Sequence, residues 1–277
     1  MTARIALASL FIVPAAMAYP WSSTAHRWLL GVAVAAVVVL FAWWRGSFMT
    51  TVIGRRLAMW RRRNHTNGAR QSSLYTTVLL KVDGPEQLPS QLIAGYLDRY
   101  GIRCDKIRIT SREFNGARTT WVSLTLSAVD NLVALSARSP RIPLRDTAEV
   151  VGRRLADHLR ETGWNVGLVD DAEAPVRHDA KETWRGLRDA SGYLAAYRVP
   201  IEDGFDEVLA VPSSEIWTAL EFSGTAADLD AAAACAIRTD DRPLTIAGVT
   251  PLNGRHRRVL DALSPLSVQR LATLTRT

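Results

Sequence analysis

Two long hydrophobic stretches without a charged residue open the chain, at residues 5–21 and 28–44. Each is seventeen residues long, about the minimum for a helix that spans a bilayer. The second, WLLGVAVAAVVVLFAWW, is rich in Val and Leu and has Trp at both ends, where indole rings prefer the headgroup boundary. Pro14 interrupts the first stretch, which a membrane helix tolerates better than a soluble one. The pattern predicts a two-helix transmembrane hairpin over residues 1–44.

The end of the first stretch, PAAMAYPW at residues 14–21, allows two interpretations. Ala16 to Ala18 match the small-residue site at which a signal peptidase cuts, whereas the following Tyr, Pro and Trp are typical of a turn at the membrane interface. We favour the retained hairpin over a cleaved leader. In the second stretch, Gly31 and Ala35 have the spacing of helices that pack closely together, although ordinary Ala and Val composition explains it equally well.

Basic residues concentrate directly after the second stretch, and the first 63 residues contain no Asp or Glu. By the positive-inside rule, this arrangement places the rest of the chain in the cytoplasm. Residues 45–73 are therefore expected to form a basic juxtamembrane segment on anionic lipid, ending in a polar linker at 64–73. The predicted membrane-interface residues are Trp21, Trp28, Trp43, Trp44, Arg45, Arg55, Arg56, Trp60, Arg61, Arg62 and Arg63.

Beyond the linker, over residues 74–169, the spacing of apolar residues alternates between the two-residue period of a strand and the 3.6-residue period of a helix. Strands are predicted at 74–82, 105–111, 119–129 and 164–169, and helices at 88–100 and from an N-cap at Asp146 to Gly163. Phe114, Asn115 and Gly116 are placed in a hairpin loop. The order strand, helix, strand, strand, helix, strand is that of a split βαβ unit with two layers.

The pattern of residues 170–277 is less regular. Strands are predicted at 192–199, 215–223 and 244–249, and helices at 225–237, where Ala predominates, and at 253–263. These elements form either a second lobe, divided from the first near 170–180, or an extension of the first sheet. The expected fold class is an α/β cytoplasmic domain with a mixed α+β sheet over residues 74–277.

Charge and motifs exclude several classes of function. The formal net charge is +7, but eight Arg lie in the first 63 residues, and the other 214 residues carry 26 basic and 27 acidic side chains. A nucleic-acid-binding protein spreads basic residues over its folded domain, so nucleic acid is not an expected partner. The nucleotide-binding, hydrolase and zinc motifs GxxxxGK[ST], GxSxG, HExxH and paired CxxC are absent. No catalytic, cofactor-binding or metal-ligating residue is assigned, and no cofactor is expected.

The remaining reactive residue types are weak candidates. Cys104 and Cys235 are expected to be reduced and packed, as in most cytoplasmic domains. Four of the five His, at 26, 65, 158 and 256, stand in polar surroundings without ligand spacing. His178, Asp179 and Glu182 follow Asp170 and Asp171 closely, which suggests a solvated acidic loop more than a metal or acid-base site.

The order of features resembles the EccE family, the membrane subunits of type VII (ESX) secretion systems. The resemblance runs along nearly the whole chain and is clearest in LPSQLIAGYLDRYGIRCDKIRITS, residues 88–111. The residues that carry it there are Tyr96, Leu97, Asp98, Gly101, Ile102, Asp105 and Ile107. It implies a retained hairpin, a glycosyltransferase-like cytoplasmic domain without shown activity, and a place beside EccB, EccD and the ATPase EccC. The family supplies no catalytic residues.

Three functions are compatible with the sequence. The first is a non-enzymatic scaffold of an inner-membrane secretion complex, which we expect. The second is a membrane-anchored envelope enzyme, such as a nucleotide-sugar-dependent transferase in which Asp170 and Asp171 hold a divalent metal. The third is a lone regulatory anchor for a soluble partner.

Overall fold

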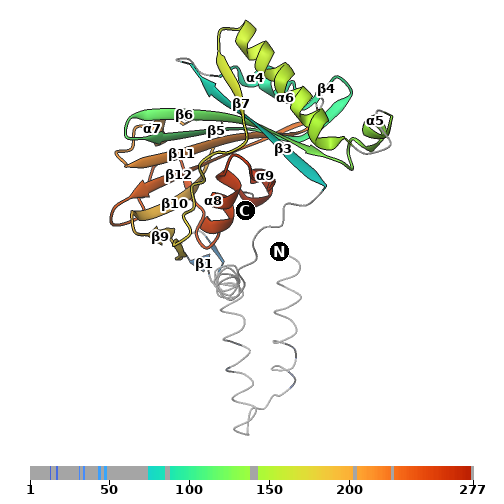
Figure 1. The fold of residues 1–277 in the computed structure, drawn as a ribbon. Helices are drawn as coiled ribbons and strands as arrows, with labels where there is room; N and C mark the ends of the chain where they lie inside the picture. The colour runs from blue at the N-terminus through green and yellow to red at the C-terminus, as the bar shows by residue number, and fades with distance from the viewer. Residues whose placement is uncertain are drawn as a thin grey trace. The chain divides into compact units, whose positions relative to one another are not determined.

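The computed structural model describes residues 74–84, 88–137, 143–201, 205–225 and 228–275. It also describes eight positions nearer the N-terminus: Val13, Met17, Gly31, Val34, Trp43, Trp44, Ser47 and Phe48. The chain divides into two units, Met1–Thr66 and Asn67–Thr277, both drawn in Figure 1.

In the first unit, β1 (Trp43–Trp44) pairs with β2 (Ser47–Phe48) in antiparallel register. The predicted helix over residues 28–44 is therefore wrong at its end, where aromatic side chains favour strand geometry. Within the described part of the chain, no helix is long and apolar enough to cross a membrane, so the predicted transmembrane hairpin is not found there. The other residues of the two stretches, apart from four helical positions, lie outside the described residues.

The second unit is built on one sheet of eleven strands, joined in the order β7-β3-β6-β5-β11-β12-β10-β9-β8, with β4 beside β5 and β13 beside β10. The strands are β3 (Tyr75–Asp83), β4 (Asp98–Arg99), β5 (Ile102–Phe114), β6 (Ala117–Ser127), β7 (Asn165–Val169), β8 (Lys181–Glu182), β9 (Leu187–Asp189), β10 (Gly192–Val199), β11 (Glu215–Gly224), β12 (Leu229–Thr239) and β13 (Thr250–Pro251).

Every described strand pair in this sheet is antiparallel, so the predicted α/β class with a mixed, glycosyltransferase-like sheet is wrong. The physical reason is the length of the connections. Parallel neighbours need a crossover of about a dozen residues or more, whereas β5–β6 and β11–β12 are joined by short turns. The predicted order of elements in 74–169 is nevertheless found, with β3 and β6 as inner strands of the β7-β3-β6-β5 half.

The second half of the chain extends the first sheet instead of forming a separate lobe. β11 pairs with β5 continuously, from Ser223 opposite Lys106 to Glu215 opposite Phe114. The segment at 170–180, considered as a boundary between two lobes, connects β7 on one edge of the sheet to β8 on the other. Its Ala172 and Val176 pack against the apolar core of one sheet face, so it crosses that face.

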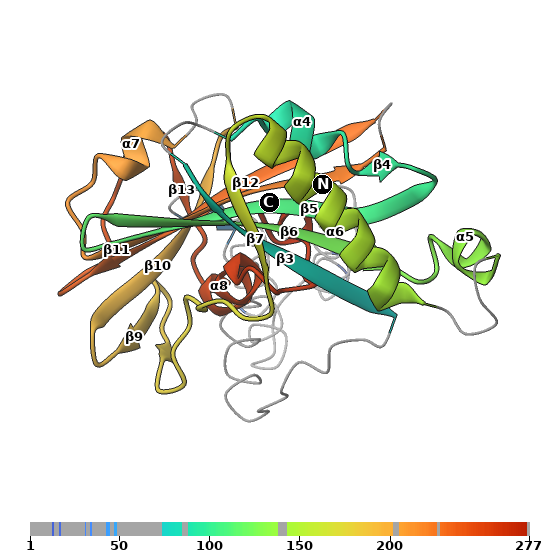
Figure 2. The ribbon, with the colours of Figure 1, turned by 45° about the horizontal axis from the view of Figure 1, so that its top comes forward.

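Helices cover both faces of the sheet, and Figures 1 and 2 show α6 on one side and α8 on the other. The described helices are α4 (Ser90–Ala94), α5 (Leu132–Ser136), α6 (Leu144–Glu161), α7 (Asp206–Leu209), α8 (His256–Leu263) and α9 (Leu271–Thr275). We call the side covered by α4 and α6 the α6 face, and the side covered by α8 and α9 the α8 face.

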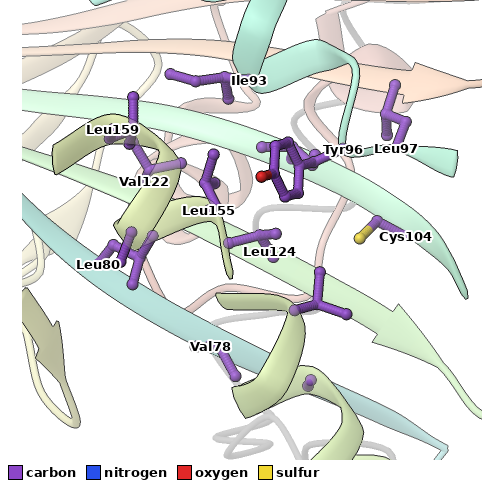
Figure 3. Packing of buried hydrophobic residues seen from close by; sticks show 14 of the residues in the cluster. Val78, Leu80, Ile93, Tyr96, Leu97, Cys104, Val122, Leu124, Leu155 and Leu159 are labelled. Atoms are coloured by element: carbon purple, nitrogen blue, oxygen red, sulfur yellow. The ribbon is translucent and has the colours of Figure 1, made fainter. Parts of the chain in front are cut away.

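The core under α6 follows from the alternation of apolar residues along the strands. Leu80 on β3 and Val122 and Leu124 on β6 meet Leu155 and Leu159 of α6, and all five are fully buried (Figure 3). Fully burying such a side chain stabilises the fold by about 1.5–3 kcal/mol. This layer therefore fixes α6 against the inner strands.

Three predicted elements differ from the structure. The helix over 88–100 is short, because Gly95 ends α4 and β4 follows at Asp98. The strand over 244–249 is irregular, and only Thr250–Pro251 pairs, as β13. The helix predicted at 225–237 is the strand β12, since small side chains in the middle of the sheet let α8 and α9 pack closely, and this packing outweighs the helix propensity of Ala.

The start of α6 also differs from the prediction. The helix begins at Leu144 with Pro143 as N-cap, and no side chain caps it. Asp146 lies in the first turn instead, where a negative charge interacts favourably with the positive end of the helix dipole. The sequence therefore located the helix but not its cap.

Candidate functional site

A cluster of buried charged side chains lies on the α8 face, where β5 meets β11. Arg108 and Glu221 stand directly opposite each other in the strand register, and both side chains are fully buried. Arg108 Nε and Nη2 donate to Glu221 Oε2 at 3.0 and 2.6 Å, and Lys106 Nζ lies 3.8 Å from the same oxygen. The alternation that puts Ile107 and Ile109 on the α6 face puts these basic residues here.

The other hydrogen bonds of this cluster join it to the backbone of the C-terminal segment at 262–271. Arg108 donates to the carbonyl oxygens of Ala262, Ser264 and Gln269, while Lys106 Nζ donates to Ser267 O at 2.7 Å and to Gln269 O. Glu221 Oε1 accepts the Leu271 backbone N–H at 2.7 Å, and Arg270 pairs with Asp105. We call Lys106, Arg108, Glu221 and the segment they hold the C-terminal clasp.

The ionisation of the clasp follows from its burial. Burial, and next the charge of Arg108, lower the pKa of Lys106 to about 6, against smaller raising effects from Glu221 and Asp105. The main ion pair of the clasp is therefore Arg108 with Glu221, and the lowered pKa of Lys106 weakens its longer contact with the same carboxylate. A lysine with a lowered pKa is a chemical candidate for a nucleophile. Here its amine is fully buried and bonded to two carbonyls, which suits support better than catalysis.

A second charged network lies further along the same face. Glu215 accepts hydrogen bonds from Arg112 Nε and Arg238 Nε, both at 2.7 Å, and from Trp217 Nε1 at 3.0 Å. Burial raises the pKa of Glu215, but the bonds from Arg238 and Arg112 outweigh this effect and hold that pKa below its usual value. Arg238 Nη1 also donates to both carboxylate oxygens of Asp189, at 2.9 and 2.8 Å.

An open depression of about 700 Å³ adjoins Arg238. It is lined by Pro212, Ser213, Ser214, Arg238, Thr239, Asp240, Asp241, Arg242 and Leu244. Arg238 is already neutralised by Glu215 and Asp189, and two further carboxylates line the wall, so the charges do not single out an anionic or a cationic ligand. The depression therefore assigns no ligand class.

The acidic residues considered for a metal site do not come together. Asp170 is almost fully exposed and lies 3.5 Å from Arg145, and Asp171 accepts the Ala172 N–H. Asp179 accepts the Ala190 N–H at the surface, and Glu182 accepts the Arg257 N–H. Among the residues that the structure describes, no three His, Cys, Asp or Glu side chains are placed to hold a metal ion.

The cysteines and one histidine are buried. Cys104 and Cys235 are free and buried on the α6 face, and burial raises the pKa of each thiol to about 12. The expectation of polar surroundings is wrong for His256, which is fully buried and accepts the Ala196 N–H at Nδ1. Burial lowers its pKa to about 4. Its apolar neighbours Val259 and Leu260, at helical spacing, were the available signal.

The predicted membrane-interface residues lie outside the described residues, except for Trp43 and Trp44, whose backbone forms β1. Gly31, one of the two predicted helix-packing residues, has a helical and exposed backbone position, and Ala35 is outside the described residues. These site predictions remain predictions.

Sequence reasoning missed the clasp entirely. Its two central residues, Arg108 and Glu221, lie 113 positions apart, and only the pairing of β5 with β11 brings them together. In β5, basic residues alternate with Ile107 and Ile109, which is also the pattern of a half-exposed strand and gives no local sign of burial.

These observations define a class: a structural β-sheet protein whose buried charges hold its own C-terminal segment in place. Comparison with known proteins identifies the family. Residues 115–199 match the family model described as "Putative type VII ESX secretion system translocon, EccE". The chain is 56% identical over 280 residues to the ESX-3 secretion system protein EccE3 of Mycolicibacterium smegmatis, covering 98% of this chain and 90% of that protein.

A second relative gives the same result. The ESX-3 secretion system protein EccE3 of Mycobacterium tuberculosis is 49% identical over 286 residues, covering 97% of this chain and 86% of that protein. The chain belongs to the EccE family and is a structural subunit of a type VII (ESX) secretion system.

Proposed function

We propose that this chain is a non-enzymatic scaffold of the inner-membrane complex of an ESX-3-type secretion system. It acts beside EccB, EccD and the ATPase EccC, and its sheet domain docks on their cytoplasmic parts. The observation that carries the proposal is the likeness to EccE3 proteins over 98% of the chain. The use of the buried charges as internal support favours a structural role over catalysis.

The experiment combines deletion with complementation. Cells that lack this chain are expected to lose both the assembled membrane complex and secretion, because a scaffold acts through assembly. The wild-type chain restores both, and so does the double variant Asp170→Ala and Asp171→Ala, since neither side chain belongs to a buried network. Normal assembly without the chain would overturn the scaffold proposal. Loss of secretion in the double variant with an intact complex would favour an enzyme.

We further propose that the N-terminal part attaches the chain to the cytoplasmic membrane. The support is compositional: Trp residues at 21, 28, 43, 44 and 60 and Arg residues at 45, 55, 56 and 61–63 suit an interface with anionic lipid. Fractionation of cells tests the attachment. The chain is expected in the membrane pellet even when the other subunits are deleted, and its presence in the soluble fraction would refute direct attachment.

A further inference from the structure

One end of the sheet presents aromatic, apolar and basic side chains together on its surface. We call this set the Tyr100 surface: Arg99, Tyr100 and Arg103 from the β4–β5 hairpin, Leu132 and Val133 from α5, and Arg154 from α6. Tyr100 is 51% exposed, Leu132 50% and Val133 85%. In Figures 1 and 2, α5 and β4 lie at the same end of the sheet.

Tyr100 has an unusual backbone conformation. Its φ of 59° lies in the left-handed region, which a bulky residue rarely adopts, so the surrounding structure must hold it there. The guanidinium carbons of Arg154 and Arg99 lie 4.5 and 5.2 Å from the centre of its ring. Beneath it, the buried Tyr96 ring meets it edge-on at 6.4 Å. An exposed aromatic ring is thus fixed before any partner arrives, which reduces the entropy lost on binding.

The helix α5 is also fixed, and two of its apolar side chains are exposed. The buried Asn131 donates to Arg103 O at 2.7 Å and to Ser127 O at 2.9 Å, and accepts the Arg103 N–H at 2.8 Å. These bonds place the start of α5 beside β5. Of its apolar residues, Leu135 is fully buried, whereas Leu132 and Val133 face the solvent.

The charges of the Tyr100 surface favour an acidic partner. In the described part of the chain, Arg99, Arg103 and Arg154 have no carboxylate partner, whereas the other three arginines of α6, at 145, 153 and 160, are each paired with an acidic residue. Two exposed carboxylates lie nearby: Asp98 stands opposite Arg103 in the β4–β5 register, and Asp130 precedes Asn131. Among the described residues, neither forms an ion pair with the three arginines, so their guanidinium groups can still bind other carboxylates. The free guanidinium edges can bind carboxylates through two parallel hydrogen bonds.

The composition of this surface matches that of the centre of a protein interface, in which Tyr and Arg are enriched around apolar contacts. A lipid surface is less suitable, because lipid-binding clusters typically contain about four to eight basic residues. The Tyr100 surface contains three.

We propose that the Tyr100 surface docks a protein segment of another complex subunit in which Asp or Glu side chains stand next to apolar ones. The carboxylates bind Arg99, Arg103 and Arg154, and the apolar side chains cover Tyr100, Leu132 and Val133. This inference rests on the proposed function, because it requires that the chain is part of a complex, and it adds where and how a partner binds.

The experiment isolates the secretion complex through a tag on the ATPase subunit and measures how much of this chain accompanies it. The test variants are Arg99→Glu with Arg154→Glu, and Tyr100→Gly, which removes the ring and relieves the left-handed backbone. The matched control is Arg188→Glu on β9, an exposed arginine whose guanidinium lies 5.5 Å from the ring of Tyr193. Thermal unfolding of each purified full chain checks that the fold is intact.

Recovery is expected to fall about tenfold for both test variants, equal to about 1.4 kcal/mol of binding free energy, and to stay at the wild-type level for the control. Unchanged recovery of the folded test variants would overturn the docking surface while leaving the scaffold function intact. Absence of the wild-type chain from the complex would overturn both.

A photocrosslinking amino acid in place of Val133 identifies the partner. Its crosslink is expected in a peptide of another subunit that is rich in Asp or Glu. Crosslinking to lipid alone, together with loss of binding of the charge-reversed variant to anionic vesicles, would refute a protein partner.

Discussion

Replacing Glu221 with Gln should severely destabilise the sheet domain. Glu221 is fully buried and receives two hydrogen bonds from Arg108 and one from the Leu271 backbone. Gln keeps the shape and one acceptor oxygen but removes the negative charge. Arg108 then stays in the same buried place without a counter-charge.

The magnitude follows from this uncompensated charge. Breaking a buried ion pair by removing one partner costs about 3–5 kcal/mol, whereas the whole stability of a domain is about 5–15 kcal/mol. The single variant should therefore lose at least a fifth of its stability, and most of it if the domain lies at the low end of that range. Replacing both partners, as Arg108→Met with Glu221→Leu, should cost less than Glu221→Gln alone, because no charge is left buried. The carbonyls of Ala262 and Gln269 would still lose a donor.

Urea unfolding of the full chain in mild detergent, followed by Trp fluorescence, measures these free energies. Amide hydrogen exchange at Leu271 reports whether the C-terminal segment opens first, since its N–H is bonded to Glu221. The reasoning is refuted if Glu221→Gln loses less than about 1 kcal/mol, the range of an exposed ion pair, or if the double variant is the less stable one.

Three further predictions concern other parts of the chain. Because His256 has a pKa of about 4 when folded and about 6.5 when unfolded, stability should fall as the pH drops from 6.5 towards 4. By pH 5, urea unfolding should show a loss about 2 kcal/mol larger in the wild type than in His256→Asn. Gly152→Ala in α6 should lower stability by about 1–3 kcal/mol, despite the higher helix propensity of Ala, because its Cβ would lie 2.7 Å from Val78 Cγ1. Gly167→Ala on β7, with open space around the Cβ, should be tolerated, and thermal unfolding of both variants measures the difference. Replacing Arg61 to Arg63 with Gln should weaken flotation with anionic vesicles by about 1 kcal/mol per residue at low salt, and equal flotation of wild type and variant would contradict a lipid contact there.

The first half of the sheet could be predicted because the apolar residues of each element repeat at the spacing typical of a strand or a helix. β3, β5 and β6 contain runs of alternating or continuous apolar residues, and Asn115 and Gly116, both with positive φ, form the turn between β5 and β6. Such signals are local, so a short window of sequence is sufficient to read them.

The strand β12 could not be predicted for the opposite reason. Its run of Ala has a high intrinsic helix propensity, and its strand geometry comes from pairing with β11 on one side and β10 on the other. The same limitation concealed the clasp, since the burial of Lys106 and Arg108 depends on a segment some 160 residues later that covers them. Without that segment, DKIRITS reads as an ordinary half-exposed strand.

The clasp and the Tyr100 surface use arginine in contrasting ways, and this contrast bears on function. On the α8 face, Arg108 is fully bonded inside the domain, so it stabilises the sheet and offers nothing to a partner. At the end of the sheet, Arg99 and Arg154 lie against an exposed ring and have no carboxylate partner among the residues that the structure describes. A sheet domain that binds the charges of Arg108 and Glu221 internally and presents Tyr100 and its arginines at one end is suited to the proposed role of positioning other subunits. Changes in the clasp should therefore alter stability first and assembly only as a consequence, whereas changes in the Tyr100 surface should alter assembly at constant stability.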